Sequence, residues 1–176
     1  MCGVKNGTSL HSCLAVKGNK RKMSSLESEK KEAQGLDGLT QLLSNVENGV
    51  RFGMMETLDL SCVKIERGSV KFQGIPSSRF YNPGNISHGG YAATLLDCAC
   101  GGAVYSCLQA DQSCTTVELK IAYHKPIVEE TGPVYAEGRV LSMGKRIGFA
   151  VAEIKDANGR LYASATSTLL ITNKNA

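Results

Sequence analysis

The sequence has no apolar run that approaches the roughly 20 residues needed to cross a membrane. Residues 1–26 also lack the apolar core of a signal peptide, since their longest apolar run is residues 13–16. No phosphate-binding loop, dinucleotide-binding fingerprint or metal-ligand cluster occurs in the chain. These absences predict a protein that needs no membrane, no metal and no resident cofactor.

Acidic residues are missing from residues 1–26, which carry five basic side chains. The rest of the chain has 15 basic and 16 acidic side chains, so the net charge of +4 at pH 7 comes from this leader. We therefore expect a disordered basic leader over residues 1–26 and a single domain over residues 27–176. Without a basic surface, the domain is not expected to bind nucleic acid. A cytoplasmic location and import into an organelle through the leader both stay open.

Paired cysteine spacing of the kind that holds zinc is also missing, although the chain contains seven cysteines. Unpaired cysteines favour a reducing, cytosolic-type compartment. Cys98, Cys100 and Cys107 fall in a predicted helix, where a cysteine usually packs as a small apolar residue. The alternative is a catalytic thiol, which would need a histidine that faces it.

Apolar residues recur at helical spacing in two places. The first is a short amphipathic stretch, residues 36–46, with Asp37 or Gly38 as its start signal and Asn48-Gly49 as its stop signal. The second runs from Gly90 to about Ala110 and is apolar on nearly all sides, so we expect this helix to be buried. Its many glycines and alanines keep it slim enough to pack closely against a sheet.

Stretches rich in β-branched and aromatic residues lie on both sides of the second helix and predict antiparallel strands. Gly68-Ser69 and Asn158-Gly159 provide the tight turns of two hairpins. The predicted strands cover residues 58–65, 70–73, 115–125, 133–142, 147–155 and 160–172. Strands before and after one long buried helix indicate an α+β fold, in which a single sheet curls around that helix.

Three groups suited to acyl transfer lie within sixteen residues around the start of the buried helix. Asn82 belongs to a loop rich in proline and glycine, His88-Gly89-Gly90 precedes the helix, and Asp97 follows inside it. The N–H groups of the first helical residues have no acceptor within the helix, and the helix dipole suits them to a developing oxyanion. Asp97 is a carboxylate in an otherwise apolar segment, which favours a functional role over a structural one.

The sequence of this motif resembles that of the hotdog-fold acyl-CoA thioesterases of the phenylacetic-acid-degradation (PaaI-like) type. In that family an Asn, a His-Gly-Gly and an Asp recur with the spacing seen here, and the resemblance covers roughly residues 36–172. It implies an antiparallel β-sheet wrapped around one long central helix. It also implies hydrolysis of an acyl-CoA to free acid and CoA, so that coenzyme A is part of the substrate and no cofactor is needed.

Acyl transfer gives each residue of the motif a role. The Gly89 N–H, with help from Gly90, would polarise the thioester carbonyl, and Asp97 would act as a general base or attack as a nucleophile. Asn82 would hold the water or the thioester, and His88 would orient the loop or donate a hydrogen bond to the substrate. Each also has a structural alternative, as a turn residue, a helix-start residue or a site of close packing.

The resemblance adds further candidates for contacts with the nucleophile and the substrate. Relatives of this type carry a Ser or Thr that positions the nucleophile; Thr116 stands at that place, and Thr115 is an acceptable substitute. The candidate cations for the phosphates of CoA are Arg139, Lys145 and Arg146, with Lys125 less favoured. The alternative is that these side chains are solvated charges without a ligand. Six large apolar side chains are candidates for the lining of an acyl pocket and equally for the core: Phe52, Met54, Met55, Phe80, Tyr91 and Tyr123.

Helix geometry predicts how the site is assembled. Gly89 and Asp97 are eight residues apart, which places them about 12 Å apart along a helix axis. Groups that act on one carbonyl must lie within about 3 Å of the reacting atoms, so both cannot act from the same chain. Two central helices packed antiparallel about a two-fold axis would bring Gly89 of one chain opposite Asp97 of the other. We therefore expect a homodimer with composite sites, and the resemblance implies a dimer or a dimer of dimers, a homotetramer.

Other functions stay open at this point. A non-catalytic acyl-CoA sensor or carrier with the same fold is the alternative, although such a binder gains nothing from a carboxylate beside the thioester. A hydratase of this fold typically uses a closely spaced Asp and His in a different loop, and no such pair occurs here. Small, medium-chain and aromatic acyl groups are all compatible with the sequence.

Overall fold

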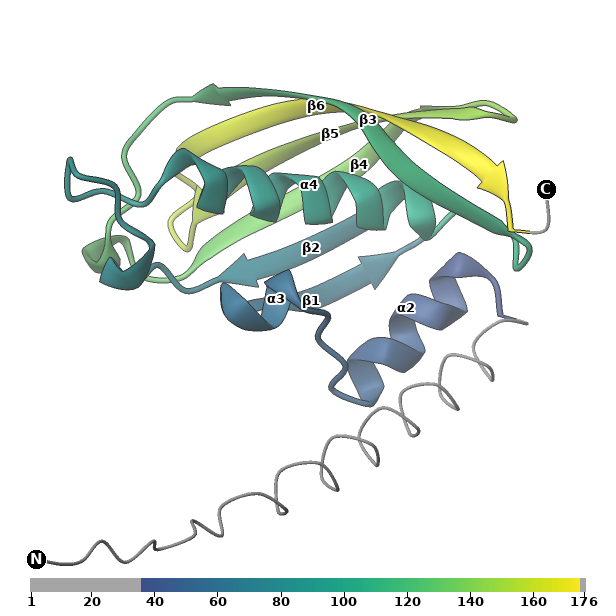
Figure 1. The fold of residues 1–176 in the computed structure, drawn as a ribbon, viewed down its shortest axis with the longest axis horizontal. Coiled ribbons are helices and arrows are strands. Elements are labelled where there is room, and N and C mark those ends of the chain that lie inside the picture. The colour runs from purple at the N-terminus through teal and green to yellow at the C-terminus, as the bar shows by residue number, and fades with distance from the viewer. Residues whose placement is uncertain (1–35, 175–176) are drawn as a thin grey trace, which may run out of the picture. The chain divides into compact units, whose positions relative to one another are not determined.

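The computed structural model describes residues 36–174, and the predicted leader over residues 1–26 lies outside this range. The described helices are α2 (Gly38–Glu47), α3 (Met54–Thr57) and α4 (Gly89–Tyr105), and short 3₁₀ turns are η2 (Ser78–Phe80) and η3 (Glu129–Thr131) (Figure 1). The strands are β1 (Leu60–Glu66), β2 (Ser69–Gly74), β3 (Gln112–Tyr123), β4 (Val134–Met143), β5 (Ile147–Asp156) and β6 (Leu161–Asn173).

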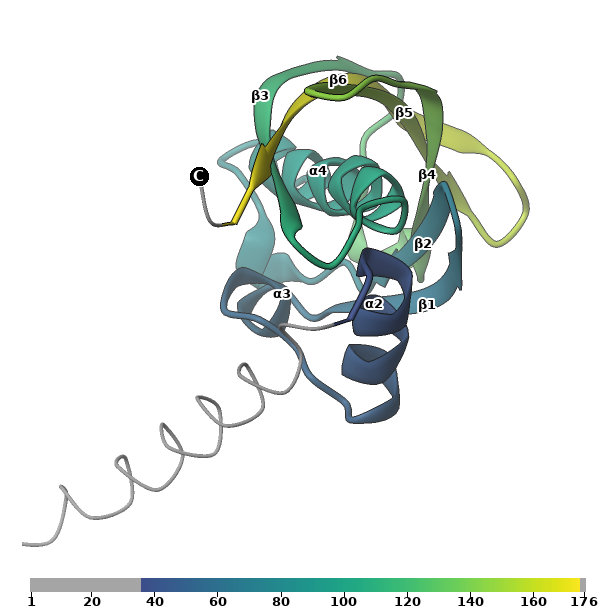
Figure 2. The same cartoon turned by 90° about the vertical axis from the view of Figure 1, so that its right-hand side faces the viewer.

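All six strands form one antiparallel sheet in the order β1-β2-β4-β5-β6-β3. The hairpins β1–β2, β4–β5 and β5–β6 join neighbours in sequence, whereas β3 crosses over to the far edge and pairs with β6. Seen along the helix, the sheet curls around α4 (Figure 2). The α+β hotdog fold that the sequence predicts is therefore confirmed.

The curl of the sheet buries α4 against its inner face. Leu95, Leu96 and Ala99 are fully buried there. The helix comes so close to β4 that a Cβ added at Gly138 would lie 2.1 Å from the backbone oxygen of Ala99. Only glycine at position 138 allows this approach, which fixes the depth of α4 in the sheet.

The helix α2 docks at the C-terminal end of α4. Its N-cap is Asp37, whose Oδ1 accepts from the Thr40 N–H at 2.9 Å. The Gly38 N–H donates to Leu108 O at 3.0 Å, and Arg67 joins Asp37 Oδ2 at 3.0 Å. These contacts hold the predicted amphipathic helix beside the sheet and over one side of α4.

Two boundaries differ from those that the sequence predicts. The helix α4 ends at Tyr105 instead of about Ala110, because the N–H groups of Cys107 and Leu108 donate three residues back, to Val104 O and Tyr105 O, each at 3.0 Å. The first hairpin turn is Arg67-Gly68, since Glu66 and Ser69 already pair across the strands. Among residues 36–174, no helix combines the length and the apolar character that membrane crossing requires.

Candidate active site

The loop before α4 is fixed by short-range hydrogen bonds. Asn82 Oδ1 accepts from the Gly84 N–H at 2.8 Å, and the Asn82 N–H donates to Ile86 O at 2.8 Å. A little further on, the Ser87 N–H donates to Ile127 O at 2.8 Å, in the segment that follows β3. The loop is thereby anchored at its start and at its end, which gives the first turn of α4 a defined orientation.

His88 is the N-cap of α4. Its backbone N–H donates to Phe80 O at 2.7 Å, and its ring Nδ1 accepts from the Gly90 N–H at 3.0 Å. A ring nitrogen that accepts a hydrogen bond carries no proton, so the neutral imidazole holds its proton on Nε2. The Gly90 N–H, expected to assist at the thioester, is therefore already engaged. Within residues 36–174 the Gly89 N–H has no protein acceptor and is open to a ligand.

Asp97 lies about 12 Å from Gly89 along the axis, because α4 is continuous between them. Its carboxylate is half-buried, and Thr116 Oγ1 donates to Asp97 Oδ1 at 2.8 Å. Within the described part of the chain no cation forms an ion pair with Asp97. The carboxylate therefore keeps acceptor capacity that a water or a substrate can use.

A β-bulge lies directly beside Thr116. The register of β3 against β6 shifts between Thr116 and Glu118, so Val117 is an extra residue and is 57% exposed. Bulges re-aim the neighbouring side chains and recur next to active sites. Thr115 is exposed, as expected for the alternate face of the strand. The structure thus brings Thr116, and not Thr115, to Asp97.

The cysteines near Asp97 are held as thiols. Burial, reinforced by the Asp97 carboxylate, raises the pKa of Cys98 and of Cys114 to about 11. The same causes raise the pKa of Cys100 to about 12. A thiol that stays protonated at neutral pH is a poor nucleophile, which disfavours the catalytic-thiol alternative.

Asp97 and Thr116 line a pocket of about 410 Å³, which we call the Asp97 pocket. The α2–α3 region covers one side of it with Leu42, Phe52 and Met55. Polar side chains of the pocket are Gln41, Asn45 and Tyr105, and the Tyr105 hydroxyl donates to Gln41 Oε1. The pocket therefore joins an apolar wall to a carboxylate.

A second pocket, of about 610 Å³, contains the other half of the motif, and we call it the Gly89 pocket. Gly89 and Asn82 line it together with Ser87 and Lys125. Tyr123 also lines it and donates through its hydroxyl to Gly89 O at 3.1 Å. Asn82 and Gly89 thus share one pocket, whereas Asp97 and Thr116 share another.

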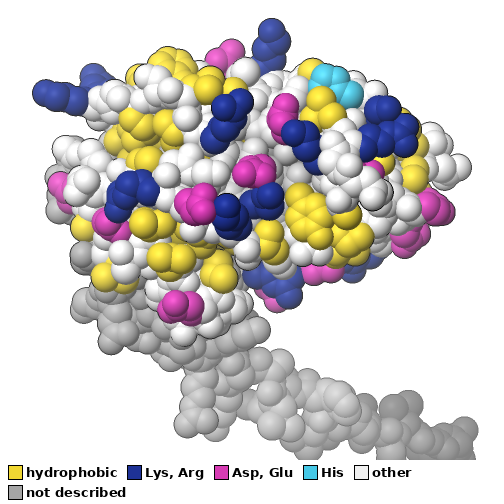
Figure 3. Space-filling view, turned by 180° about the vertical axis from the view of Figure 1, so that it is seen from behind, with side chains coloured by type: hydrophobic (Ala, Val, Ile, Leu, Met, Phe, Trp, Pro, Cys, Tyr) yellow, Lys and Arg dark blue, Asp and Glu magenta, His cyan; other side chains and the backbone are white. Residues whose placement is uncertain are grey.

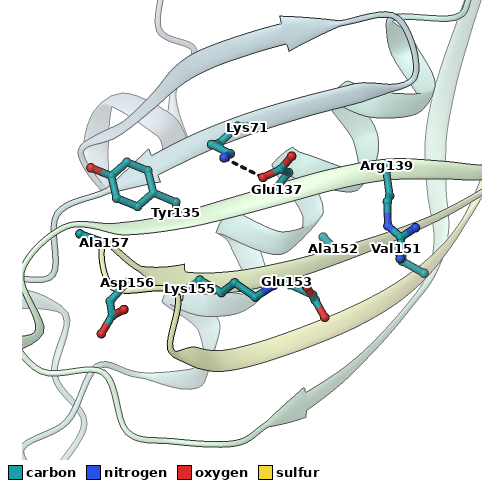
Figure 4. A pocket seen from close by; sticks show the side chains of 11 residues that line it. Lys71, Tyr135, Glu137, Arg139, Val151, Ala152, Glu153, Lys155, Asp156 and Ala157 are labelled. Carbon is teal, nitrogen blue, oxygen red and sulfur yellow. Dashed lines mark hydrogen bonds and ion pairs between the residues drawn. The ribbon is translucent and has the colours of Figure 1, made fainter.

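Three of the cations expected to bind phosphate, Arg139, Lys145 and Arg146, lie outside both pockets, whereas the less favoured Lys125 lines the Gly89 pocket. Lys145 and Arg146 are exposed in the turn between β4 and β5. Arg139 lines a groove of about 700 Å³ on β2, β4 and β5 (Figure 4), which none of the motif residues lines. Basic and acidic side chains are interspersed on the face seen in Figure 3, and four of the charged side chains in the groove pair as Lys71–Glu137 and Lys155–Glu153, each at 2.7 Å. Although it is the larger hollow, the groove is therefore a less suitable reaction site.

The apolar candidates divide between the two pockets and the core. Phe52 and Met55 line the Asp97 pocket, and Tyr123 lines the Gly89 pocket. Phe80 and Tyr91 stack with their ring centroids 5.2 Å apart. Met54 is 63% exposed. Sequence reasoning did not single out Ser87, because a serine in a loop is usually a turn residue.

Known proteins resemble this chain in sequence and in fold. A family model described as the thioesterase superfamily matches residues 84–163. A Saccharolobus solfataricus protein provisionally described as an esterase is 32% identical over 115 residues, which cover 65% of this chain and 79% of that protein. A conserved protein of Pseudomonas aeruginosa is 26% identical with a TM-score of 0.65, over 69% of this chain and 95% of that one. The E. coli PaaI protein matches in fold, with a TM-score of 0.67 at 17% identity, over 74% and 93% of the two chains.

Proposed function

This chain belongs to the thioesterase superfamily, and we propose that it hydrolyses acyl-CoA thioesters to the free acid and coenzyme A. Thioester hydrolysis follows from the family; the acyl-CoA substrate and the roles of the residues are the proposal. The observation that carries the proposal is the Asp97 carboxylate beside an apolar pocket, which is oriented by a hydrogen bond of 2.8 Å from Thr116 Oγ1 to Asp97 Oδ1.

The proposed reaction uses one amide and one carboxylate. The Gly89 N–H binds the thioester oxygen and stabilises the negative charge that develops there. Asp97 takes a proton from an attacking water, or attacks the carbonyl itself to form an anhydride that water then opens. In either route the carbon–sulfur bond breaks, the acyl group departs as a carboxylic acid, and the leaving thiolate of CoA takes up the proton that is left on Asp97. Because a thiolate is a good leaving group, these two groups suffice.

The separation of Gly89 and Asp97 supports a composite site in a homodimer. The part of α4 around Asp97 and Gly101 is only half-buried in the single chain, and Gly101 has open space around it. The strand β3 is an edge of the sheet and pairs with β6 alone. A second copy related by a two-fold axis would cover both features and set its Asp97 opposite Gly89. Two such dimers would form the expected dimer of dimers.

Subunit mixing tests the composite site. Asp97→Asn removes the carboxylate function, and Gly89→Pro removes the open N–H. Each variant alone should be nearly inactive, but a mixed dimer regains one intact site from the Gly89 of one chain and the Asp97 of the other. We expect thiol release to return when the two variants are co-expressed. If every mixture stays inactive while the mixed dimer is isolated, the composite site is wrong.

The acyl group is proposed to lie in the Asp97 pocket. A volume of about 410 Å³ lined by Phe52, Met55 and Phe72 suits a medium-chain or aromatic acyl group. A thiol-release panel of acyl-CoA substrates tests this, with the highest kcat/KM expected for acyl groups of about six to ten carbons or one ring. Binding of acyl-CoA without any turnover would instead support a sensor or carrier.

A further inference from the structure

Three serine side chains are buried in the described residues, and one of them differs from the other two. Ser106 is fully buried; its hydroxyl donates to Ala103 O at 2.7 Å and accepts from the Gly68 N–H at 2.8 Å. The buried Ser167 hydroxyl donates to Glu118 O at 2.9 Å. The residue Ser87 is 9% exposed, and its buried hydroxyl has no hydrogen-bond partner among residues 36–174. Burial without a partner destabilises the folded state, so this serine calls for an explanation.

The surroundings of Ser87 indicate a ligand. Ser87 lines the Gly89 pocket together with Gly89, whose N–H also has no acceptor among residues 36–174. The hydroxyl of Tyr91 is also buried without a partner, but it packs against backbone, since a Cβ at Gly74 would lie 2.4 Å from it. Of these two hydroxyls, Ser87 is the one that lines a cavity of about 610 Å³.

The shape and chemistry of the Gly89 pocket suit a linear chain with apolar and amide segments. Ile86, Ala92 and Ile127 supply apolar walls, whereas Ser87 and Asn82 supply polar groups. Exposed side chains, His124 and Lys125, stand at its edge, and within residues 36–174 Lys125 forms no ion pair. The pocket therefore leads from the Gly89 N–H to solvent past a cation.

We propose that Ser87 binds the first amide of the pantetheine arm of the thioester, which lies in the Gly89 pocket while the acyl group occupies the Asp97 pocket of the second copy. The inference rests on the proposed function and adds a residue to it. With the thioester oxygen on the Gly89 N–H, this amide follows the sulfur after two carbons and lies next to Ser87, two residues away in the chain. The hydroxyl donates to the amide oxygen or accepts from the amide N–H.

The experiment compares two substrates that differ only in this amide. One is the acyl thioester of N-acetylcysteamine, which retains the amide, and the other is the thioester of pentanethiol, in which methylenes replace it. For Ser87→Ala we expect kcat/KM to fall about tenfold on the first substrate, through KM, and less than about twofold on the second. Because the variant removes an unpartnered hydroxyl, its Tm should equal or exceed that of the wild type.

Ser106→Ala is the matched control, since it removes a buried hydroxyl that has partners. It should lower Tm by about 4 °C or more and change kcat/KM equally on both substrates. An equal loss on both substrates for Ser87→Ala, or a fall in its Tm like that of Ser106→Ala, would overturn the role of Ser87. If the wild type hydrolyses neither these thioesters nor acyl-CoA, the proposed function fails and this inference with it.

Discussion

At its C-terminal end, α4 is tied into the fold by every polar group of Ser106. The Ser106 N–H donates to Gly102 O at 2.9 Å, its hydroxyl has two partners, and its carbonyl accepts from Arg67 at 3.3 Å. At the N-terminal end of the same helix, the Gly89 N–H and the Ser87 hydroxyl have no partner among the described residues.

The difference separates two uses of one helix. Satisfied groups at the C-terminal end contribute to stability, because each would be costly to leave unpaired. A buried hydroxyl without a partner, such as that of Ser87, reduces stability and is retained where a ligand completes it. Substitutions at the C-terminal end should therefore change Tm more than rate, and those at the N-terminal half should change rate more than Tm.

The largest effect on rate should come from Asp97→Asn, which replaces the carboxylate of Asp97 in α4 with an uncharged group of the same shape. The amide oxygen can still accept from Thr116, so we expect Tm to change little. Loss of the base or nucleophile should lower kcat by about 10³-fold in a thiol-release assay. Asp111→Asn, an exposed acid beyond the C-terminal end, is the control and should keep wild-type kcat. Turnover retained by Asp97→Asn would contradict the assignment.

The open amide of Gly89 can be removed without breaking the helix. Proline is favoured at the first helical position, and His88 has φ −55° and ψ 140°, which a following proline accepts. Gly89→Pro should lower kcat by about 10²- to 10³-fold, the effect of losing one oxyanion donor.

Gly89→Ala is the control for the added bulk, because it keeps the N–H. Its Cβ would lie 3.1 Å from the Tyr123 hydroxyl, so that ring must shift slightly. We expect this variant to retain most of the activity that Gly89→Pro loses. Equal losses in the two variants would assign the effect to crowding and not to the amide.

A smaller effect is expected for Thr116→Val, which removes the hydrogen bond to Asp97 and preserves the shape of the side chain. Less precise orientation of the carboxylate should lower kcat about tenfold, with KM nearly unchanged. Thr115→Val, on the exposed face of the same strand, should have wild-type kinetics. Similar kinetics for both variants would show that Thr116 has no positioning role.

The smallest effect concerns stability near the C-terminal end of α4, where Asp37, the N-cap of α2, pairs with Arg67. Hydrogen bonds from Thr40 first, and then Arg67, hold the pKa of the Asp37 carboxyl at about 2 in the folded state. A lowered folded pKa means that this stabilisation is complete above the unfolded value of about 3.9 and is lost as the pH falls towards 2. The Tm of the wild type should exceed that of Asp37→Asn above pH 4, and the two should converge towards pH 2. A Tm difference that stays constant over this range would contradict the assignment.

Local signals predicted most of the fold. Asp37 and Asn48 mark the ends of α2, and Asn158-Gly159 marks the last hairpin, because caps and turns depend on a few neighbouring residues. The hotdog arrangement was predictable because an apolar helix needs a sheet to cover it. The position of β3 beside β6 depends on contacts far apart in sequence, which no local pattern encodes.

The candidate site was predictable in its residues but not in their environments. The motif located Asn82, Gly89 and Asp97, yet the engagement of the Gly90 N–H by His88 is a matter of ring orientation. The bulge at Val117 has no glycine or proline to signal it. The missing partner of the Ser87 hydroxyl is visible only once burial and hydrogen bonds are known.

The covering of the Asp97 pocket by α2 and α3 has a consequence for evolution. The carboxylate comes from α4, whereas Leu42, Phe52 and Met55 come from an earlier part of the chain that contributes little to the sheet. Mutations in that earlier part can alter the size of the acyl compartment while the reactive helix stays unchanged. Diversification of acyl preference among descendants of this gene is therefore expected to accumulate between residues 38 and 58.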